Sequence, residues 1–148
     1  MPVPASGAGE LPFFVYGTLR PGQDNHDRFL RGRTAGEEPA RLPGAVLHEG
    51  PGYPFLAGGA GEVRGELVWA APGEYGALLS VLDRLERFTA PGHPLNLYER
   101  RAREVRRARD GSAVRAWVYL AAPAVRLGAA IAGGDWLNRP GAPEPPLP

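Results

Sequence analysis

The stretch FFVYGTLRPG, residues 13–22, decides how the rest of the sequence can be arranged. Its first four residues are aromatic or β-branched, which is typical of a buried β-strand. The strand ends abruptly at Gly17, a residue that permits a positive φ and lets backbone approach a ligand without an intervening Cβ. Successive amide groups in such a turn form a concave anion site. We therefore interpret the loop from Gly17 as a cradle for a small acidic ligand. An ordinary strand-end turn at Arg-Pro-Gly is the alternative.

The composition around this stretch is that of one globular domain. The chain has 148 residues, of which 43% are hydrophobic and 22% are charged, and its net charge is +1. A charge so close to neutral gives no overall field that would recruit nucleic acid or membrane. The chain has no cysteine, which excludes disulfides, thiolate metal sites and a cysteine nucleophile. All 17 basic residues are arginine, which GC-rich codon usage explains better than anion recognition does.

The sequence predicts one central domain with a short segment outside it at each end. We expect residues 1–11 to form a flexible leader, residues 12–137 a single domain and residues 138–148 a proline-rich tail. The first residues lack the basic and apolar regions of a signal peptide. No run approaches the roughly 18 apolar residues that a membrane-spanning helix needs. The sequence therefore predicts a soluble, cytoplasmic protein without a membrane partner.

Four segments carry strong signals of secondary structure. Residues 62–70 alternate between apolar and polar, which predicts a strand with one face in the core. Gly65 in its middle suggests a bulge or a close backbone approach. Residues 73–88 are predicted to form the main helix, with leucines at i, i+4 and i+7. Residues 98–107 and 113–121 are predicted to pair as a hairpin around an Asp-Gly turn.

Weaker signals complete the prediction of the fold. We expect a short helix over residues 26–32, a strand over 40–50 that is broken by Pro-Gly, a turn-rich segment over 50–61 and a short helix over 121–132. Strands predominate and do not alternate with helices. The sequence therefore predicts an α+β fold, a small, mixed, mainly antiparallel β-barrel with one main helix.

Glu86 is the one carboxylate of the main helix that is predicted to face the interior. On a wheel with roughly 100° per residue it falls about 70° from the centre of the apolar stripe, whereas Asp83 falls outside the stripe. Loss of hydration would raise the pKa of Glu86 toward neutrality, where a glutamate can shuttle protons. The alternative is a flanking side chain that reaches water or pairs with an arginine.

The other polar residues suggest no second site. The three histidines lie far apart without ligand spacing, so we expect no metal. Six arginines between Arg100 and Arg109 would point to both faces of a strand and have few aromatic neighbours, so we expect a solvated strand pair and no nucleic-acid partner. Asp135 is expected to cap a turn and Trp136 to seal the core.

Several motifs together resemble the γ-glutamylcyclotransferase-like superfamily. They are FVYGTLRPG near the N-terminus, LDRLE in mid-chain, a strand that begins with tyrosine, and GGDW near the end. The match runs from about Phe13 to Trp136. In that family a Tyr-Gly-[Ser/Thr]-Leu-type loop binds the γ-glutamyl moiety, and the acid of a Leu-Asp-x-x-Glu motif is the catalytic base. The loop and the acid are fairly specific as a pair.

The resemblance implies a set of site residues. Glu86 would be the catalytic acid/base. The acid is followed by Arg87, where the family usually has a small residue such as glycine, and the segment up to Tyr98 is long and contains prolines. These departures concern substrate identity more than fold. The substrate-binding residues that the resemblance implies are Tyr16, Gly17, Thr18, Leu19, Arg20, Tyr98 and Tyr119.

The implied reaction is intramolecular. The α-amine of a γ-glutamyl amine or peptide attacks its own γ-carbonyl, which releases 5-oxoproline and a free amine. The resemblance thus implies an amidine- or amide-cleaving lyase or an acyltransferase, with a small-molecule substrate and no cofactor. Two alternatives stay open. One is a non-catalytic module of the same fold that binds small acidic ligands, and the other is a nucleic-acid or interaction protein led by the arginine run. No pattern in the sequence indicates the leaving group or the oligomeric state.

Overall fold

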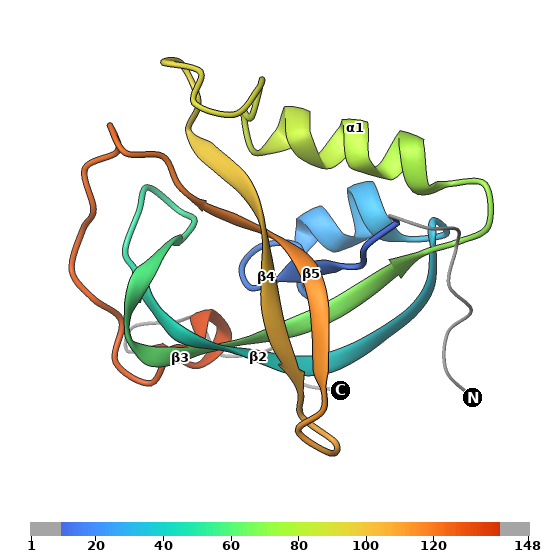
Figure 1. Ribbon diagram of the computed structural model, residues 1–148, viewed down its shortest axis with the longest axis horizontal. Coiled ribbons are helices and arrows are strands. Elements are labelled where there is room, and N and C mark those ends of the chain that lie inside the picture. Colours follow the sequence, from blue (N-terminus) through green and yellow to red (C-terminus); the bar gives the residue numbers. More distant parts are fainter. Residues whose placement is uncertain (1–9, 140–148) are drawn as a thin grey trace.

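The fold is a closed five-stranded barrel with one long helix packed on its outside (Figure 1). The computed structural model describes residues 10–139, so the expected leader and tail fall almost entirely outside the described residues. The predicted α+β barrel is confirmed. The strands are β1 (Phe13–Val15), β2 (Thr34–His48), β3 (Phe55–Ala70), β4 (Tyr98–Arg107) and β5 (Ala113–Ala121), and the helices are the π-helix η1 (His26–Leu30), α1 (Tyr75–Leu85) and the 3-10 helix η2 (Trp136–Asn138).

Although β1 has only three residues, it closes the barrel. It pairs antiparallel with β3, where Phe14 lies opposite Leu67, and parallel with β5, where Phe13 lies opposite Trp117. The strand order is β1-β3-β2-β4-β5, and the other pairings are antiparallel. All of β1 is buried, which explains why its sequence is continuously apolar rather than alternating. Because both edges of β1 are paired, the loop that follows it starts from a fixed position.

The long hairpin of β2 and β3 forms much of the barrel wall, and the sequence prediction was wrong there in two places. The strand predicted to break at Pro43 is continuous from Thr34, with a register shift next to the proline. Residues 55–61, predicted as part of a turn-rich segment, belong to β3. Their glycines permit close pairing with β2, since a Cβ at Gly59 would lie 2.4 Å from Cγ2 of Val46.

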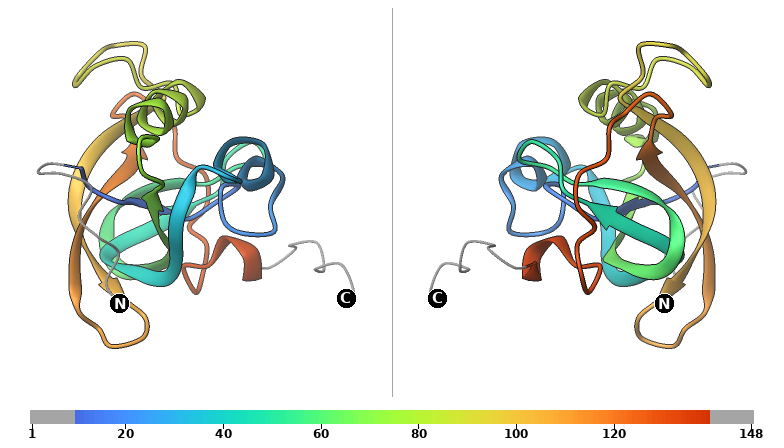
Figure 2. Two further views of the ribbon diagram at one scale, coloured as in Figure 1. Left: turned by 90° about the vertical axis from the view of Figure 1, so that its right-hand side faces the viewer. Right: turned by 90° about the vertical axis from the view of Figure 1, so that its left-hand side faces the viewer.

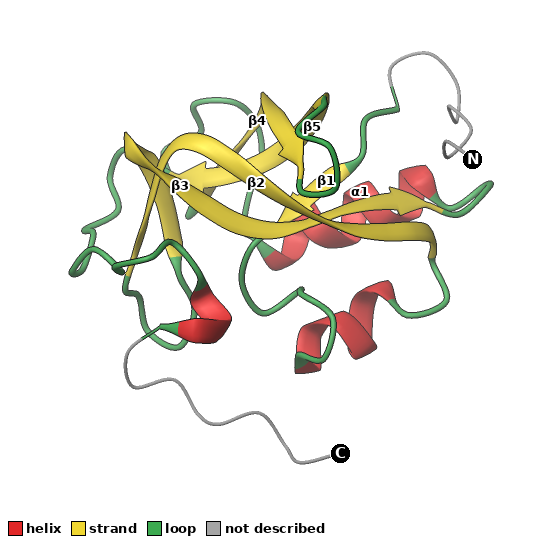
Figure 3. Ribbon diagram, turned by 90° about the horizontal axis from the view of Figure 1, so that it is seen from below, coloured by secondary structure: helices red, strands yellow, loops and turns green. Residues whose placement is uncertain are grey.

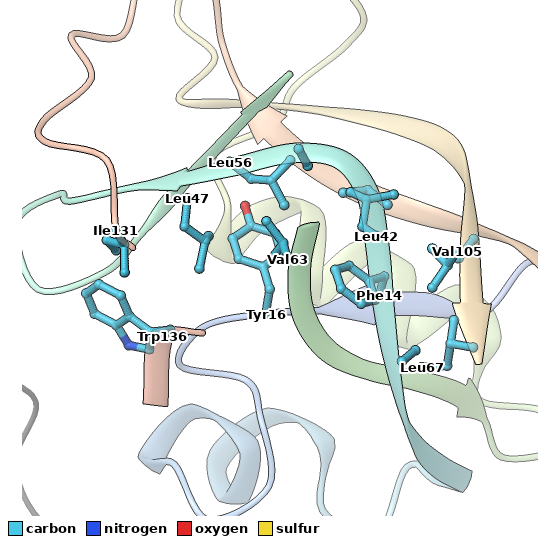
Figure 4. Packing of buried hydrophobic residues seen from close by; sticks show 14 of the residues in the cluster. Phe14, Tyr16, Leu42, Leu47, Leu56, Val63, Leu67, Val105, Ile131 and Trp136 are labelled. Atoms are coloured by element: carbon cyan, nitrogen blue, oxygen red, sulfur yellow. The ribbon is translucent and has the colours of Figure 1, made fainter. Parts of the chain in front are cut away.

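Two hydrophobic clusters stabilise the fold. The first fills the barrel and includes Val118 and Trp136 (Figure 4). The second lies between the barrel and the helices, where Leu78 and Leu82 of α1 are fully buried. Burying a leucine side chain contributes on the order of 2 kcal/mol. The side chains of β5 alternate between the two clusters, because Val118 belongs to the barrel interior and Tyr119 to the cluster beneath the helices.

The helices all lie outside the barrel (Figures 2 and 3). η1 contacts α1, whereas η2 lies at the end of the barrel away from α1 (Figure 2). η1 falls within the predicted short helix but has π geometry. The helix predicted over residues 121–132 was wrong, because backbone groups there pair with the end of β2. Ile131 N–H, for example, donates to the carbonyl of Leu47 at 2.8 Å. Within residues 10–139 no helix is long and apolar enough to cross a membrane.

The β4–β5 hairpin has its predicted bounds, and its arginines are largely neutralised. Five of the six arginines between residues 100 and 109 form ion pairs with carboxylates, at N–O distances from 2.7 to 3.8 Å. The sixth, Arg103, is exposed and donates to the carbonyl of Ala102. The arginines therefore stabilise the hairpin and its neighbours by short-range pairing.

α1 ends in a Schellman motif with an arginine where glycine is usual. The N–H of Arg87 donates to the carbonyl of Arg84 at 3.2 Å, and the N–H of Phe88 donates to that of Asp83 at 2.8 Å. Arg87 has a φ of 51°, the only positive φ at a non-glycine residue in the described part of the chain. A residue with a Cβ is disfavoured there by about 1–2 kcal/mol. The motif fixes Glu86 as the residue that caps the helix.

The loop over residues 88–97, between α1 and β4, is held together by one buried side chain. Asn96 accepts a hydrogen bond from the N–H of Thr89 at 2.8 Å and donates another to Glu99. Glu99 also accepts from the N–H of Gly92 at 3.1 Å. The hydrogen bond from Asn96 lowers the pKa of Glu99, so the carboxylate that organises the loop is ionised at neutral pH.

Gly65→Ala is expected to destabilise the protein strongly. A Cβ at Gly65 would lie 2.2 Å from the carbonyl oxygen of Val15 and 2.9 Å from the ring of Phe14, so β3 and β1 would have to separate. This confirms the close backbone approach that the sequence suggested. We expect the free energy of unfolding, measured by urea denaturation, to fall by about 3 kcal/mol.

Gly76→Ala is the matched control. Gly76 is exposed within α1, and nothing lies within 4 Å of a Cβ placed there. Alanine in a helix is favoured over glycine by about 0.5–1 kcal/mol, so this variant should be more stable than the parent protein. Equal stability of the two variants would contradict the contact between β1 and β3.

Arg87→Gly is expected to raise the free energy of unfolding by about 1 kcal/mol, because glycine adopts the left-handed conformation without a steric penalty. Arg87→Ala removes the same guanidinium but keeps the Cβ, so it should give no comparable gain. The measurement is a pair of denaturant titrations. An equal gain in both variants would show that the charge, and not the backbone, opposes stability at this residue.

Candidate active site

A cavity of about 300 Å³ lies where several elements of the fold meet. The end of β1, the turn before β3, the C-terminus of α1, the start of β4 and a part of β5 all contribute to it. A volume of this size suits a small molecule. The lining residues are Phe14, Val15, Tyr16, Gly17, Thr18, Leu19, Asn25, Gly52, Tyr53, Pro54, Leu85, Glu86, Arg87, Leu97, Tyr98 and Tyr119.

The structure brings seven of the eight site residues expected from the sequence to this one cavity. Glu86 comes from the end of α1, and Gly17 comes from the loop after β1, 69 positions earlier in the chain. They meet because β1 closes the barrel beneath the helix layer (Figure 1). The seven are Tyr16, Gly17, Thr18, Leu19, Glu86, Tyr98 and Tyr119.

Glu86 is half-buried, and within residues 10–139 its carboxylate has no hydrogen-bond or ion-pair partner. Burial raises the pKa of Glu86 from 4.5 to about 7. The physical cause is the loss of hydration, which disfavours the charged form when no cation or donor compensates it. The cavity therefore contains a carboxyl group that both releases and accepts a proton near neutral pH.

Of the four tyrosines that line the cavity, three have hydroxyl protons that are already engaged. Tyr16 donates to the backbone carbonyl of Tyr119, Tyr98 donates to the carbonyl of Pro54 at 2.6 Å, and Tyr119 donates to Asp83 at 2.6 Å. Burial is the main reason why the pKa of each phenol lies above its usual range, and repulsion from Glu86 adds to it. All three phenols are neutral, and their oxygens keep lone pairs that can accept from a ligand.

The loop after β1 presents backbone donors to the cavity. The φ of Gly17 is not positive, so the expected use of a left-handed conformation there is wrong. Glycine is needed instead for packing, because a Cβ would lie 2.9 Å from the ring carbons of Pro54. Within residues 10–139 the amides of Gly17, Thr18 and Leu19 donate to no carbonyl or side chain. They are therefore available to an anionic group.

Arg20 is the predicted site residue that does not line the cavity. Its guanidinium binds Glu66 with Nε at 2.8 Å and Asp135 with Nη1 at 2.7 Å. Asp135 also accepts from the N–H of Leu137, which confirms the predicted cap, and Trp136 is buried as predicted. Arg20 thus ties the loop after β1 to β3 and to the segment before η2, and it acts on the cavity only through the position of that loop.

A second ion pair fixes the helix that carries Glu86. Asp83 accepts from Nε of Arg100 on β4 at 2.8 Å and from the hydroxyl of Tyr119 on β5. The guanidinium of Arg100 lies 4.4 Å from the centre of the Trp117 ring. Asp83 falls outside the apolar stripe of α1, as predicted, yet it joins the helix to both strands of the hairpin. This network orients Glu86 and Tyr119 relative to each other.

Several lining residues were missed by sequence reasoning. Tyr53 and Pro54 lie in a segment that reads only as a turn, and their place beside Gly17 follows from the pairing of β1 with β3. Asn25 carried no signal, although it donates to the Thr18 hydroxyl at 2.7 Å. The small residue, such as glycine, that the resembling family usually has at the position of Arg87 could have indicated its left-handed conformation.

The described residues offer no cluster of three or more histidine, cysteine, aspartate or glutamate side chains that could hold a metal ion. His26 pairs with Glu37 at 2.6 Å, and His48 bonds to the carbonyl of Gly128 at 3.0 Å. The polar groups that line the cavity are one carboxyl group, four phenols, backbone amides and the side chains of Thr18, Asn25 and Arg87.

Comparisons with known proteins agree with this geometry. The family described as "Gamma-glutamyl cyclotransferase, AIG2-like" matches residues 13–138. The γ-L-glutamyl-butirosin B γ-glutamyl cyclotransferase of Niallia circulans is 33% identical over 118 residues, which cover 79% of this chain and 71% of that protein. An AIG2-like protein from Mus musculus has a crystal structure with a TM-score of 0.60 and 25% identity, covering 88% of this chain and 84% of that chain.

More distant structures share the fold. An uncharacterised protein from Pyrococcus horikoshii has a TM-score of 0.59 at 23% identity, covering 86% of this chain and 90% of that chain. A family match over nearly the whole described part, together with a curated relative above 30% identity, is decisive. The chain belongs to the AIG2-like γ-glutamyl cyclotransferase family.

Proposed function

We propose that this chain cyclises the γ-glutamyl group of a γ-glutamyl amine or γ-glutamyl peptide, with Glu86 as the acid/base. The observation that carries the proposal is a carboxyl group of pKa about 7 without a partner in the described residues, in the same cavity as the free amides of residues 17–19. Membership of the family and the name of the Niallia circulans relative support the reaction class.

The reaction balances without water. The substrate α-nitrogen forms a bond to the γ-carbonyl carbon, and the bond from that carbon to the leaving nitrogen breaks. The α-nitrogen, which starts as an ammonium group, gives up two protons, and the leaving nitrogen gains two if it departs as ammonium. Glu86 accepts each of the two protons in turn as a carboxylate and passes it to the leaving nitrogen, so that it acts as base and then as acid for each transfer. The acyl group passes to an amine of the same molecule and to no second acceptor, which favours the lyase over the acyltransferase description.

The remaining groups of the cavity hold the substrate in a reactive conformation. The phenolic oxygens of Tyr16, Tyr98 and Tyr119 can accept hydrogen bonds from the α-ammonium group, because their own protons are engaged elsewhere. The free amides of the loop can donate to the oxygen of the γ-carbonyl as it gains negative charge. Because the reaction is intramolecular, holding the substrate folded supplies much of the rate enhancement.

Glu86→Gln is expected to abolish most of the activity while the protein stays folded. The amide has nearly the same shape but cannot accept the proton, so kcat for release of 5-oxoproline should fall by about 10²–10⁴-fold. The assay measures 5-oxoproline from a panel of γ-glutamyl amines and dipeptides. Glu104→Gln, on the exposed face of β4, is the control and should keep full activity. Unchanged turnover by Glu86→Gln would overturn the assigned role, and substrate binding without any turnover by the parent protein would indicate a binding module.

The ionisation of Glu86 should appear in the pH dependence of activity. The base must be ionised, and its pKa is about 7, so kcat/KM should fall about tenfold per pH unit below that value. The check is a pH–rate profile from about pH 5 to about pH 8, which spans the pKa of Glu86. An acid limb near the ordinary glutamate pKa would contradict the assignment.

The same ionisation should appear in stability. The native state binds the Glu86 proton more tightly than the unfolded state does, so stability falls as pH rises from 4.5 to about 7. Above that range the buried charge destabilises the protein by up to about 3 kcal/mol. Glu86→Gln should therefore be more stable than the parent protein at high pH and show little gain at acidic pH. Denaturant titrations at the two pH values test this, and a pH-independent difference would contradict it.

A further inference from the structure

A second hollow lies beside the cavity, between η1 and α1. It is a more open groove of about 390 Å³. Apolar side chains of Phe29, Val81 and Leu85 form one part of its lining, and the guanidinium-bearing residues Arg28, Arg33 and Arg84 form the rest. Among residues 10–139 no carboxylate lines it. We call this hollow the arginine groove.

The positive charge of the arginine groove is not neutralised within the described part of the chain. Arg28, Arg33 and Arg84 form no ion pair with any residue in this part of the chain. Arg20 and Arg100, in contrast, are paired with carboxylates. Arg84 has only a hydrogen bond of 3.4 Å to the Ser80 hydroxyl. The groove therefore differs from the β4–β5 hairpin, where neighbouring acids neutralise most arginines.

The arginine groove adjoins the cavity. Leu85 lines both hollows, and it immediately precedes Glu86. A substrate whose γ-glutamyl group occupies the cavity can extend its leaving group past Leu85 into the groove. The groove would then offer that leaving group an apolar surface followed by a cluster of guanidinium groups.

The helix dipole does not explain this arrangement by itself. An arginine in the last turn of a helix, such as Arg84, is favoured by the partial negative charge of the C-terminus. Arg33 lies outside any helix, and Arg28 belongs to η1, yet both face the same groove. Three arginines brought together from separate segments repel one another, and an anionic ligand would relieve that repulsion.

We propose, on the basis of the proposed function, that the arginine groove binds a carboxylate at the far end of an aliphatic leaving group. The preferred substrates are then γ-glutamyl amides of amino acids with an apolar chain and a terminal carboxylate. A guanidinium fork matches the planar geometry of a carboxylate. Leaving amines that end in a second ammonium group are disfavoured by the same charges.

Three substrates of matched length test the proposal. They are the γ-glutamyl amides of 5-aminopentanoate, pentylamine and 1,5-diaminopentane, which end in a carboxylate, a methyl group and an ammonium group. We expect kcat/KM to decrease in that order, with about a tenfold difference between the first and the last. High salt should reduce the difference, because it screens charges in an open groove.

Substitutions of the groove arginines test whether these side chains cause the preference for the carboxylate substrate. Arg84→Gln and Arg33→Gln should each lower kcat/KM for the carboxylate substrate by about three- to fivefold and leave the pentylamine substrate nearly unchanged. Arg84→Glu should favour the diaminopentane substrate over the carboxylate one. Arg103→Gln removes an exposed arginine of β4 and should leave all three values unchanged.

Binding to Glu86→Gln separates this proposal from the proposed function. Calorimetry with the same three amides should give the same order of affinity in a protein that does not turn them over. Absence of 5-oxoproline from every amide with the parent protein would overturn the proposed function, while the order of affinities would still decide the groove. Equal affinities, or an order that Arg84→Glu does not change, would overturn the arginine groove as a carboxylate site.

Discussion

The pairing of β1 with two strands at once is the constraint on which the cavity depends. One edge of Phe13–Val15 meets β3 and the other meets β5, so this short strand cannot shift without opening the barrel. The contact at Gly65 brings backbone against backbone and leaves no room for adjustment. The loop from Gly17 inherits that rigidity, which is what holds its free amides in place beside α1.

The arginines near the site pair with acids other than Glu86, so within residues 10–139 Glu86 has no ion-pair partner. Arg20 binds Glu66 and Asp135, and Arg100 binds Asp83. Each of these carboxylates has a guanidinium partner within 3 Å. For Glu86 only the loss of hydration on burial acts, and it raises the pKa to about 7. The protonated and ionised forms of Glu86 are therefore close in free energy at neutral pH. The stability that this carboxylate removes is offset by apolar burial in the two hydrophobic clusters.

Much of the fold could be predicted because its strongest signals are local. The alternation of residues 62–70, the leucine spacing of α1 and the bounds of β4 and β5 follow from periodicity alone. The prediction was wrong where strand pairing in the folded protein, and not the local sequence, decides the secondary structure. Glycines that suggest a turn over residues 55–61 serve close strand contact, and the small residues of 121–132 pair with β2 rather than forming a helix.

The site could be predicted where a residue sits on a regular element. The wheel placed Glu86 because α1 is a regular helix, and the family pattern indicated which loop it faces. Arg20 shows the limit of that reasoning. It lies within the motif, but its side chain follows the positions of Glu66 and Asp135, which the sequence does not reveal. Tyr53 and Pro54 were missed for the same reason, because only barrel closure brings them to Gly17.

The loop tied by Asn96 has a consequence for the thermodynamics of ligand recognition. Its polar network is internal, so the segment between α1 and β4 is already ordered before a ligand arrives. Little conformational entropy is then lost in this segment when a complex forms. Ligand binding should therefore proceed without ordering of this segment. Its heat-capacity change should be set by the apolar area that the ligand buries and not by folding of the protein.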